Sequence, residues 1–505
     1  MGWNATVVAL FSSERGAWVT KYDAVVVGSG PNGLAAAVHL VSSGFKTLLV
    51  EAAPRIGGGL RSEALTLPGF LHDHCAAIHT MGVISPFFNS LPLGEHGLEW
   101  AFPSASVAHP LDDAPAVMLE HSLAETARGL GADGDGYARL LAPFLRDPHG
   151  LFQDLLGPLG IPDHPFTMLR FGLHALRPAT WLARRFSEPR ARALFAGCAA
   201  HSVLPLSAWG TAAFGLAFLL TGHMERWPAV RGGSERLANA LEGVFRARGG
   251  EVQTGLSVDR LDQLPPARVV LFDTSPRELS RIAGDALPAR YRRRLGRYVY
   301  GPGLFKLDFA LSQPIPWRDP DCLRASTLHL GGTLEEIAAA EAAVWRGEVP
   351  ERPYVLLCQQ SQFDDTRAPP GQHTGYAYCH VPAGCELDAS RQIEAQIERF
   401  APGFRDTILA RHVSTPADLE HYNTSFVGGA VTGGAALLTQ LFTRPVARLD
   451  PYSTPNPSLF LCSQSTPPGG GVHGMCGYYA AESAIRRLNG GRWWGKSRRP
   501  LRLTA

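Results

Sequence analysis

The chain has 505 residues, 45% of them hydrophobic, so it is long enough for two or three globular domains. Its 47 basic and 45 acidic side chains give a net charge of +2 without a basic stripe, which argues against nucleic acid as a partner. The eight cysteines show no CxxC pair and no metal-ligand spacing, so we expect a cytoplasmic protein with neither disulfides nor a metal site.

The first 21 residues precede the first predicted strand. The apolar run from Ala5 to Phe11 is short and has no positive charge before it, so it is a poor secretory signal. Met1, Gly2 and Thr6 match a loose N-myristoylation pattern, but a start codon assigned too far upstream explains this stretch at least as well. We expect residues 1–21 to be a disordered extension.

A β-branched run and a glycine loop follow this extension. Val25, Val26 and Val27 are typical of a parallel strand buried on both faces, and a GxGxxG motif comes directly after them. The glycines of such a motif allow a tight turn, a close approach of backbone amides to a diphosphate, and packing of the next helix on the strand. The pattern predicts a helix from about Pro31 to Ser43 whose N-terminus faces the diphosphate.

The residues after this helix strengthen the dinucleotide hypothesis. Gly44 ends the helix, and "KTLLVE" is typical of a second strand. Glu51, at the end of that strand, lies where an acid binds the ribose hydroxyls of a dinucleotide, about 20 residues after the glycines. If the glycine turn served packing alone, Glu51 would have no explanation.

The stretch "AAPRIGGGLRS" directly follows Glu51. It resembles the Glu-x-x-x-Arg-x-Gly-Gly signature of two-domain FAD enzymes, in which the glycines pass the diphosphate and ribityl chain. Arg55 and Arg61 match the basic positions of that signature. The resemblance therefore favours FAD over NAD.

Further blocks carry the resemblance along the chain. They are "EALTLPGFLHDHCAAIHT", "VRGGSERLANALEGVFRARGGEVQTGLSVDRL", "VVLFDTSP", "GPGLFKLDFALSQPIPW" and "PPGGGVHGMCGYYAAESAIRRL". In order and content they resemble the phytoene desaturase-like flavoproteins, within the carotenoid desaturases and FAD-dependent amine oxidases, over residues 22–490.

This resemblance implies an α/β protein with a discontinuous Rossmann-type FAD-binding domain and an inserted α+β substrate-binding domain. The FAD-binding domain is expected at 22–75, 228–285 and 445–490. The substrate-binding domain is expected at 76–227 and 286–444, and a C-terminal tail at 491–505.

An apolar stretch from Ser202 to Leu220 approaches the length of a membrane span, but it contains Pro205, hydroxyls and glycines. We predict a buried helix lining a pocket. If the substrate is a lipid, this helix and the preceding "TWLARRF" are suited to a peripheral membrane contact, and an ordinary core helix is the alternative.

Two later segments are predicted near the cofactor. "EVQTGLSVDRL" is interpreted as a strand pair, and in the family Val258 lies where the backbone holds the adenine. "RVVLFDTSP" is predicted to be a central strand that ends near the cofactor.

Lys306 lies in the apolar strand "LFKLDFAL" of a chain with only four lysines. It resembles the strand lysine of flavin amine oxidases, which holds a water against flavin N5. The alternative is an edge-strand lysine that reaches solvent or pairs with Asp308.

The last block is interpreted as a glycine loop before an amphipathic helix, whose first amides would stabilise the reduced flavin. His473 in this loop either faces the substrate or hydrogen-bonds to backbone. The candidate catalytic residues are Lys306 and His473. By resemblance, the residues that bind FAD are Gly28, Ser29, Gly30, Pro31, Asn32, Gly33, Glu51, Ala52, Arg55, Gly57, Gly58, Gly59, Arg61, Val258, Gly471, Val472, Gly474 and Met475.

The resemblance implies an oxidoreductase with one non-covalent FAD that removes two hydrogens from a hydrophobic substrate, by hydride transfer to flavin N5. Carotenoid or polyisoprenoid desaturation is the first hypothesis, flavin-dependent isomerisation the second and amine oxidation the third. A non-catalytic flavin-binding protein is a further alternative. The sequence does not indicate the electron acceptor or the oligomeric state.

Overall fold

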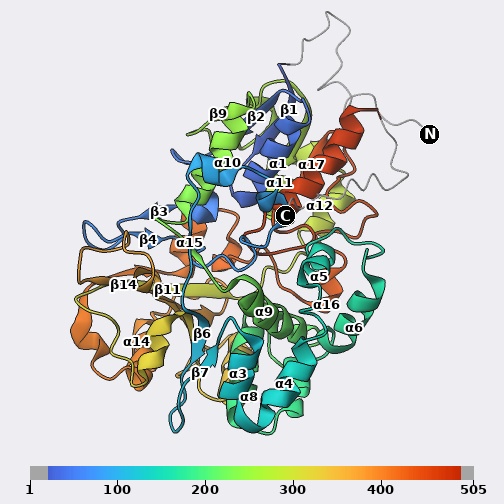
Figure 1. Cartoon of the computed structure of the whole chain (residues 1–505). Helices are drawn as coiled ribbons and strands as arrows, with labels where there is room; N and C mark the ends of the chain where they lie inside the picture. Colours follow the sequence, from blue (N-terminus) through green and yellow to red (C-terminus); the bar gives the residue numbers. More distant parts are fainter. Residues whose placement is uncertain (1–20, 491–505) are drawn as a thin grey trace, which may run out of the picture.

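A computed structural model of the chain describes residues 21–490. The expected N-terminal extension, apart from its last residue, and the expected tail at 491–505 lie outside the described residues. Figure 1 shows two layered regions, with β1, β2, β9, α1, α10 and α17 in one, and β11, β14, α8 and α9 in the other.

The first region is built on a parallel sheet with the strand order β16-β10-β1-β2-β9. Its strands are β1 (Tyr22–Val27), β2 (Thr47–Val50), β9 (Glu251–Gln253), β10 (Ala267–Phe272) and β16 (Leu459–Leu461). They come from the three segments that the sequence assigned to the FAD-binding domain. The predicted strand pair around residue 255 is wrong, because only β9 forms there and the chain after it is irregular.

Alternate residues of β1 face opposite sides of this sheet. Ala24 and Val26 pack with α1 (Pro31–Ser42), α10 (Glu235–Ala247) and α17 (Met475–Leu488). Val25 and Val27 pack with α11 (Pro276–Ala283) and α12 (Ala289–Leu295). Helices therefore cover both faces, which explains the continuous valine run. Because α12 packs here, this domain continues beyond residue 285.

The second region is built on a mixed sheet with the order β15-β11-β14-β13-β12-β6-β7. Its strands are β6 (Ala105–His109), β7 (Val117–Leu119), β11 (Gly303–Leu311), β12 (Ala325–Leu330), β13 (Val355–Cys358), β14 (His373–Val381) and β15 (Ile408–Ser414). The remaining strands form two small pairs, β3 (Ser62–Glu63) with β4 (His72–Asp73) and β5 (Trp100–Ala101) with β8 (Ala229–Val230).

The other helices belong mainly to the two inserted segments. They are α2 (Pro86–Asn89), α3 (Leu123–Gly129), α4 (Gly134–Leu141), α5 (Pro148–Leu155), α6 (Pro165–Ala175), α7 (Ala179–Leu182), α8 (Pro189–Ala200), α9 (Thr211–Glu225), α13 (Leu334–Trp345), α14 (Ser390–Phe400), α15 (Pro416–Tyr422) and α16 (Leu438–Leu441). The fold is thus the predicted α/β architecture with a second domain of mixed helices and strands.

The predicted helix over 202–220 begins later than expected. Residues 201–210 form turns around Pro205, and α9 starts at Thr211. Several side chains of α9 line a cavity, as predicted. Within residues 21–490, no helix has both the length and the hydropathy needed to cross a membrane.

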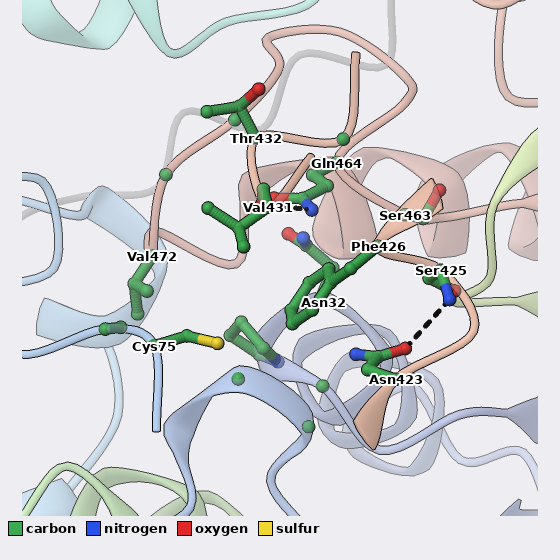
Figure 2. Close-up of a pocket in the computed structure, with 18 of the residues that line it drawn as sticks. Asn32, Cys75, Asn423, Ser425, Phe426, Val431, Thr432, Ser463, Gln464 and Val472 are labelled. Carbon is green, nitrogen blue, oxygen red and sulfur yellow. Dashed lines mark hydrogen bonds between the residues drawn. The ribbon is translucent and has the colours of Figure 1, made fainter. Parts of the chain in front are cut away.

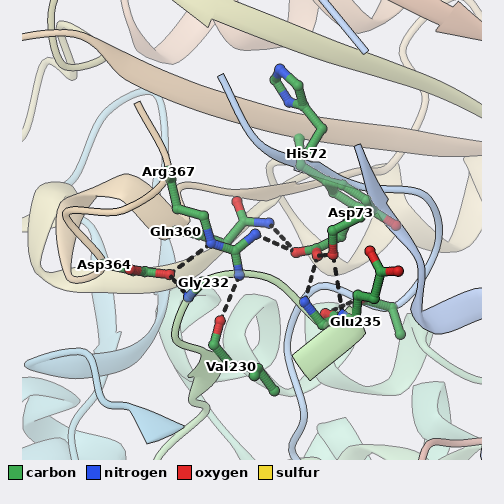
Figure 3. Close-up of polar contacts among 12 residues, drawn as sticks. His72, Asp73, Val230, Gly232, Glu235, Gln360, Asp364 and Arg367 are labelled. Carbon is green, nitrogen blue, oxygen red and sulfur yellow. Dashed lines mark hydrogen bonds and ion pairs between the residues drawn. The ribbon is translucent and has the colours of Figure 1, made fainter. Parts of the chain in front are cut away.

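A buried polar network joins the two regions. The Arg367 guanidinium donates to Asp73 at 2.7 Å, to Asp364 at 2.7 Å and to the Val230 carbonyl at 2.8 Å (Figure 3). Asp73 lies on β4, and Gln360 approaches the same carboxylate. Arg367 and its two carboxylate partners are fully buried, so their charges are compensated inside the protein.

Candidate functional site

The glycine loop after β1 has the close packing that the motif predicts. Gly28 has φ +97°, and a Cβ on Gly33 would lie 2.0 Å from the Gly28 carbonyl oxygen. A side chain at either position would distort the turn that lets α1 begin at Pro31. Gly28, Ser29, Gly30, Pro31 and Asn32 line a cavity, whereas Gly33 packs behind them.

Glu51 is held by four donors. One carboxylate oxygen accepts from the Ser29 amide at 2.9 Å and from the Ser29 hydroxyl, and the other accepts from the Ala53 amide at 2.9 Å and from Arg61 at 3.0 Å. A carboxylate offers about four such positions, so all are occupied. A ribose hydroxyl would have to displace one partner, and the Ser29 hydroxyl can rotate away most easily.

The second glycine cluster lies beside the first. Gly58, Gly59 and Arg61 line the cavity with Ala52, and a Cβ on Gly58 would lie 3.0 Å from the Gly30 Cα atom. The cluster therefore leaves the backbone open to a ligand.

Arg55 and Gly57 are not among the cavity-lining residues of the described chain. Arg55 instead forms ion pairs with Glu63 and Glu235, and Gly57 supplies a turn with φ +113°. Both support the cluster from outside.

Asp273 is a cavity residue that sequence reasoning missed. Its carboxylate, at the end of β10, accepts a hydrogen bond from the Gly33 amide at 2.8 Å. Burial raises its pKa to about 7, with Glu51 adding to the rise. The acid in "LFDTSP" was the available signal, but its position over α1 depends on the pairing of β10 with β1.

The loop before α17 lines the same cavity with Gly471, Val472 and His473, whereas Gly474 and Met475 lie behind it. His473 accepts from the Met475 amide at 3.0 Å through Nδ1, and its Nε2 lies 3.2 Å from the Gly469 carbonyl. Burial lowers its pKa to about 4. Both ring nitrogens are thus engaged with backbone, as in the second reading of this histidine.

Lys306 lies on β11, an interior strand, and its amine is buried. The amine donates to the Asp73 carbonyl at 2.9 Å, forms an ion pair with Asp308 and stands 4.5 Å from the Tyr376 ring centre. It is not among the described residues that line the cavity. This is the pairing with Asp308 that the sequence left open, and it places the amine in the buried network rather than at an edge strand.

The cavity that these loops border has a volume of about 950 Å³, at the upper end of the range for small-molecule sites. Figure 2 shows side chains of the glycine loop (Asn32), of loop 423–432 and of loop 463–472 around one space. Val258 also lines it and is buried. One continuous cavity therefore connects the predicted adenine, diphosphate and flavin positions.

The same cavity continues into the second domain, where its walls are apolar and aromatic. They include Phe152, Leu155, Leu156, Phe171, Phe214, Phe218, Trp227 and Leu356. The carboxylates that line the described cavity, namely Glu51, Asp259, Asp273 and Glu278, all belong to the dinucleotide-binding region. The second-domain end thus suits an uncharged ligand.

A buried histidine and glutamate lie at this end. His380, on β14, points to the cavity on the same strand face as Tyr376 and Tyr378. Its Nδ1 lies 2.9 Å from each carboxylate oxygen of Glu341 on α13. No described residue hydrogen-bonds to Nε2, so this atom is free to face a ligand. The alternation in "YAYCH" and the single acid in "IAAAEAAVW" were the signals that sequence reasoning missed.

A second histidine pair lies nearby. His201 stacks on Phe218 with ring centres 4.1 Å apart, and its Nε2 is 3.0 Å from Nε2 of His329. Burial lowers the pKa of His201 to about 3 and holds that of His329 well below its usual range. Both rings are neutral at ordinary pH, and His201, which lines the cavity, extends its apolar wall.

The residues present fit a dinucleotide. The two glycine clusters leave backbone exposed where a Cβ would intrude, and the Asn32 side-chain oxygen is buried without a hydrogen-bond partner in the described chain. An orphaned buried acceptor beside free helix amides is expected where a polar ligand binds.

Comparisons with known proteins agree with this geometry. Residues 26–91 match the family model of the NAD(P)-binding Rossmann-like domain. The chain is 27% identical to rat pyridine nucleotide-disulfide oxidoreductase domain-containing protein 2, over 94% of this chain and 95% of the relative. It is 24% identical to a lycopene-forming phytoene desaturase of Pseudescherichia vulneris, over 91% of this chain and 98% of the relative.

Among solved structures, the cyclohexylamine oxidase of Brevibacterium oxydans superposes with a TM-score of 0.56 at 15% identity, over 93% of this chain and 99% of the oxidase. At that identity the match concerns the fold. The Rossmann-type domain and the mixed-sheet second domain are therefore shared with an amine oxidase.

Proposed function

Because the chain is an FAD-dependent oxidoreductase of the phytoene desaturase and amine oxidase superfamily, we propose that it dehydrogenates an apolar, polyene-like substrate. The observation that carries the proposal is the single cavity that joins the dinucleotide loops to the aromatic walls of the second domain. Reaction requires the substrate carbon and the cofactor to meet within one dry space.

The cofactor in this proposal is one FAD per chain, bound without a covalent link. Glu51, Val258 and the glycine clusters hold its adenosine and diphosphate portions, and the loop at 471–473 holds the flavin. Burial raises the pKa of the cavity-lining Cys75 thiol to about 12, so this cysteine is a poor nucleophile for flavin attachment. Acid precipitation is expected to leave the yellow colour in the supernatant.

An apolar substrate is favoured over an amine by the charges around the cavity. The second-domain end offers aromatic rings and the neutral His201, and no carboxylate of the described chain lines it. A cationic amine would lose its hydration there without meeting a compensating charge. Amine oxidation therefore remains the third hypothesis.

His380 is the proposed proton acceptor. When bound, the flavin takes the hydride, so the second hydrogen must leave the substrate as a proton. Glu341 orients the His380 ring through Nδ1, which leaves Nε2 to receive the proton. Without this acceptor, an apolar cavity offers few groups for the proton.

The test is anaerobic mixing of the yellow holoprotein with phytoene in detergent micelles, and with putrescine as the amine probe. We expect phytoene and not putrescine to bleach the flavin. We expect His380→Asn to bind FAD normally and to bleach about 100-fold more slowly or worse, since general bases contribute at least that much. Bleaching by putrescine alone would contradict the proposal.

Isomerisation without net redox change remains the second hypothesis. It uses the same cavity, but the flavin colour returns without an external acceptor. Product analysis therefore separates it from dehydrogenation.

We also propose that the second domain contacts a membrane through α6. The sequence indicated residues 202–220 and the preceding segment TWLARRF for this contact, and α6 lies shortly before that segment. Phe166, Leu169, Leu173 and Leu176 form one exposed stripe, with Phe166 86% exposed. Arg170 lies within the same helix, and Arg177 stacks on the half-exposed Trp181 with its guanidinium 3.9 Å from the ring centre. An apolar stripe with basic and aromatic neighbours fits an anionic bilayer surface.

A further inference from the structure

Another buried arginine in the described chain differs from Arg367 in its surroundings. Arg444 is only 3% exposed, and its guanidinium donates to the Tyr298 hydroxyl at 3.0 Å and the Gly434 carbonyl at 3.3 Å. Its Nε has no hydrogen-bond partner, and no carboxylate of residues 21–490 forms an ion pair with it. The charge is therefore buried without compensation by the described protein.

The position of Arg444 explains where compensation can come from. The side chain lines the large cavity, between the loop at 432–434 and the glycine loop before α17. A Cβ on Gly469 would lie 2.4 Å from one terminal nitrogen of Arg444, and Gly469 has φ +121°. The glycine at this position makes room for the guanidinium beside the loop that borders the flavin site.

An unpaired buried cation is costly. Breaking a buried ion pair destabilises proteins by about 3–5 kcal/mol, because the remaining charge has lost both water and partner. An arginine that is held to two neutral acceptors and faces a ligand cavity is thus expected to complete its interactions with an anion.

We propose that Arg444 is a binding residue for an anionic oxygen of the bound dinucleotide. This proposal rests on the FAD-binding part of the proposed function. Two parts of the cofactor carry such an oxygen, namely the diphosphate and the pyrimidine edge of the flavin ring after reduction. The neighbouring loop at 469–471 favours the ring edge, and the experiment distinguishes the two.

The experiment compares wild type with Arg444→Gln, which keeps hydrogen-bond donors and removes the charge, and with Arg444→Lys, which keeps the charge. Arg190→Met is the control, because Arg190, like Arg444, bonds only to uncharged oxygen atoms and has an unpartnered Nε, but lies outside the cavity lining. For each protein we would measure the thermal midpoint of the apoprotein, the Kd for oxidised FAD and the flavin midpoint potential.

If the partner is the diphosphate, Arg444→Gln weakens the binding of oxidised FAD at least tenfold. If the partner is the reduced ring, Arg444→Gln changes the affinity for oxidised FAD little but weakens the binding of reduced FAD at least tenfold. Because the oxidised form is then favoured, the two-electron midpoint potential falls by about 30 mV or more. Arg444→Lys restores most of either loss.

The apoprotein separates this role from a merely structural one. We expect Arg444→Gln to leave the thermal midpoint of the apoprotein unchanged or higher, because an uncompensated charge has been removed. A lower apoprotein midpoint with unchanged FAD affinity and potential, as a structural residue would give, overturns the proposal. Bleaching of wild-type holoprotein by substrate tests the proposed function separately.

Discussion

Two glycines of the first motif and the acid after the next strand were predictable because their roles are local. Gly30 and Gly33 act within one turn, and Glu51 ends the strand next to it. Asp273, His380 and Arg444 were not predictable, because each gains its role from a segment far away in the chain. The contacts of Lys306 were predictable only in part: Asp308, two residues later on the same strand face, could be predicted as its partner, but Asp73 could not.

At the residue scale, we predict that Gly30→Val abolishes FAD binding and that Glu51→Ala weakens it. A Cβ at Gly30 would already lie 2.6 Å from the Asp273 carboxylate, whereas Glu51→Ala removes a charged acceptor worth about 1.5–3 kcal/mol per hydrogen bond. The flavin content of purified protein checks both. Full occupancy in Gly30→Val would contradict the assigned position of the diphosphate.

Asp273 predicts a pH dependence. Its pKa is about 7 when folded and 3.8 in an unfolded reference, so the folded state binds the proton more tightly. Stability of the apoprotein therefore falls as pH rises from about 4 to about 7 and is level above that, by an amount on the order of a few kcal/mol.

Asp273→Asn is expected to remove this contribution. The thermal midpoint of the variant should be higher than that of wild type, and this difference should be larger at pH 8 than at pH 5. At pH 8 the variant should also bind the anionic FAD more tightly than wild type does. Equal differences at both pH values would show that the carboxyl is ionised throughout.

At the scale of elements, the strand–turn–helix–strand unit and α17 were predicted closely, because hydrophobic periodicity and glycine positions determine them. The pair expected after β9 failed because that chain has few strand residues and no partner beyond β2. The late start of α9 at Thr211 follows from Gly210, whose left-handed backbone with φ +87° cannot continue a helix from the residues before it.

The buried network between β4 and β11 predicts what Lys306→Met does. The change leaves Asp308 without its cation, so unfolding should become easier by about 3–5 kcal/mol. Denaturant unfolding measures this. The double variant Lys306→Met/Asp308→Leu should recover part of the loss, because both charges are gone. Unchanged stability with slowed flavin reduction would instead restore a role for Lys306 beside the flavin.

At the scale of the whole molecule, the inserted domain places α6 between the cavity and the surface. Phe171 faces the cavity, while Phe166 and Leu173 on the same helix face outward. The outward direction of the α6 stripe could not be predicted from the sequence, because a stripe of large apolar residues on a helix ordinarily indicates the side that faces the core.

The membrane proposal predicts that holoprotein floats with vesicles of phosphatidylcholine and phosphatidylglycerol, and less so at high salt. Phe166→Ser/Leu173→Ser should abolish flotation. Leu387→Ser/Leu409→Ser changes two exposed apolar residues elsewhere and should not. Flotation that is unaffected by the α6 variant, or wild-type protein that stays with the soluble fraction, would contradict the proposal.

The most direct test of the account is a single anaerobic turnover with phytoene, followed by mass analysis of the product. Dehydrogenation in the shared cavity predicts a product that lacks two hydrogen atoms for each flavin reduced. Two results would contradict the account. One is a product of unchanged mass with the flavin again oxidised, and the other is a flavin that putrescine reduces but phytoene does not.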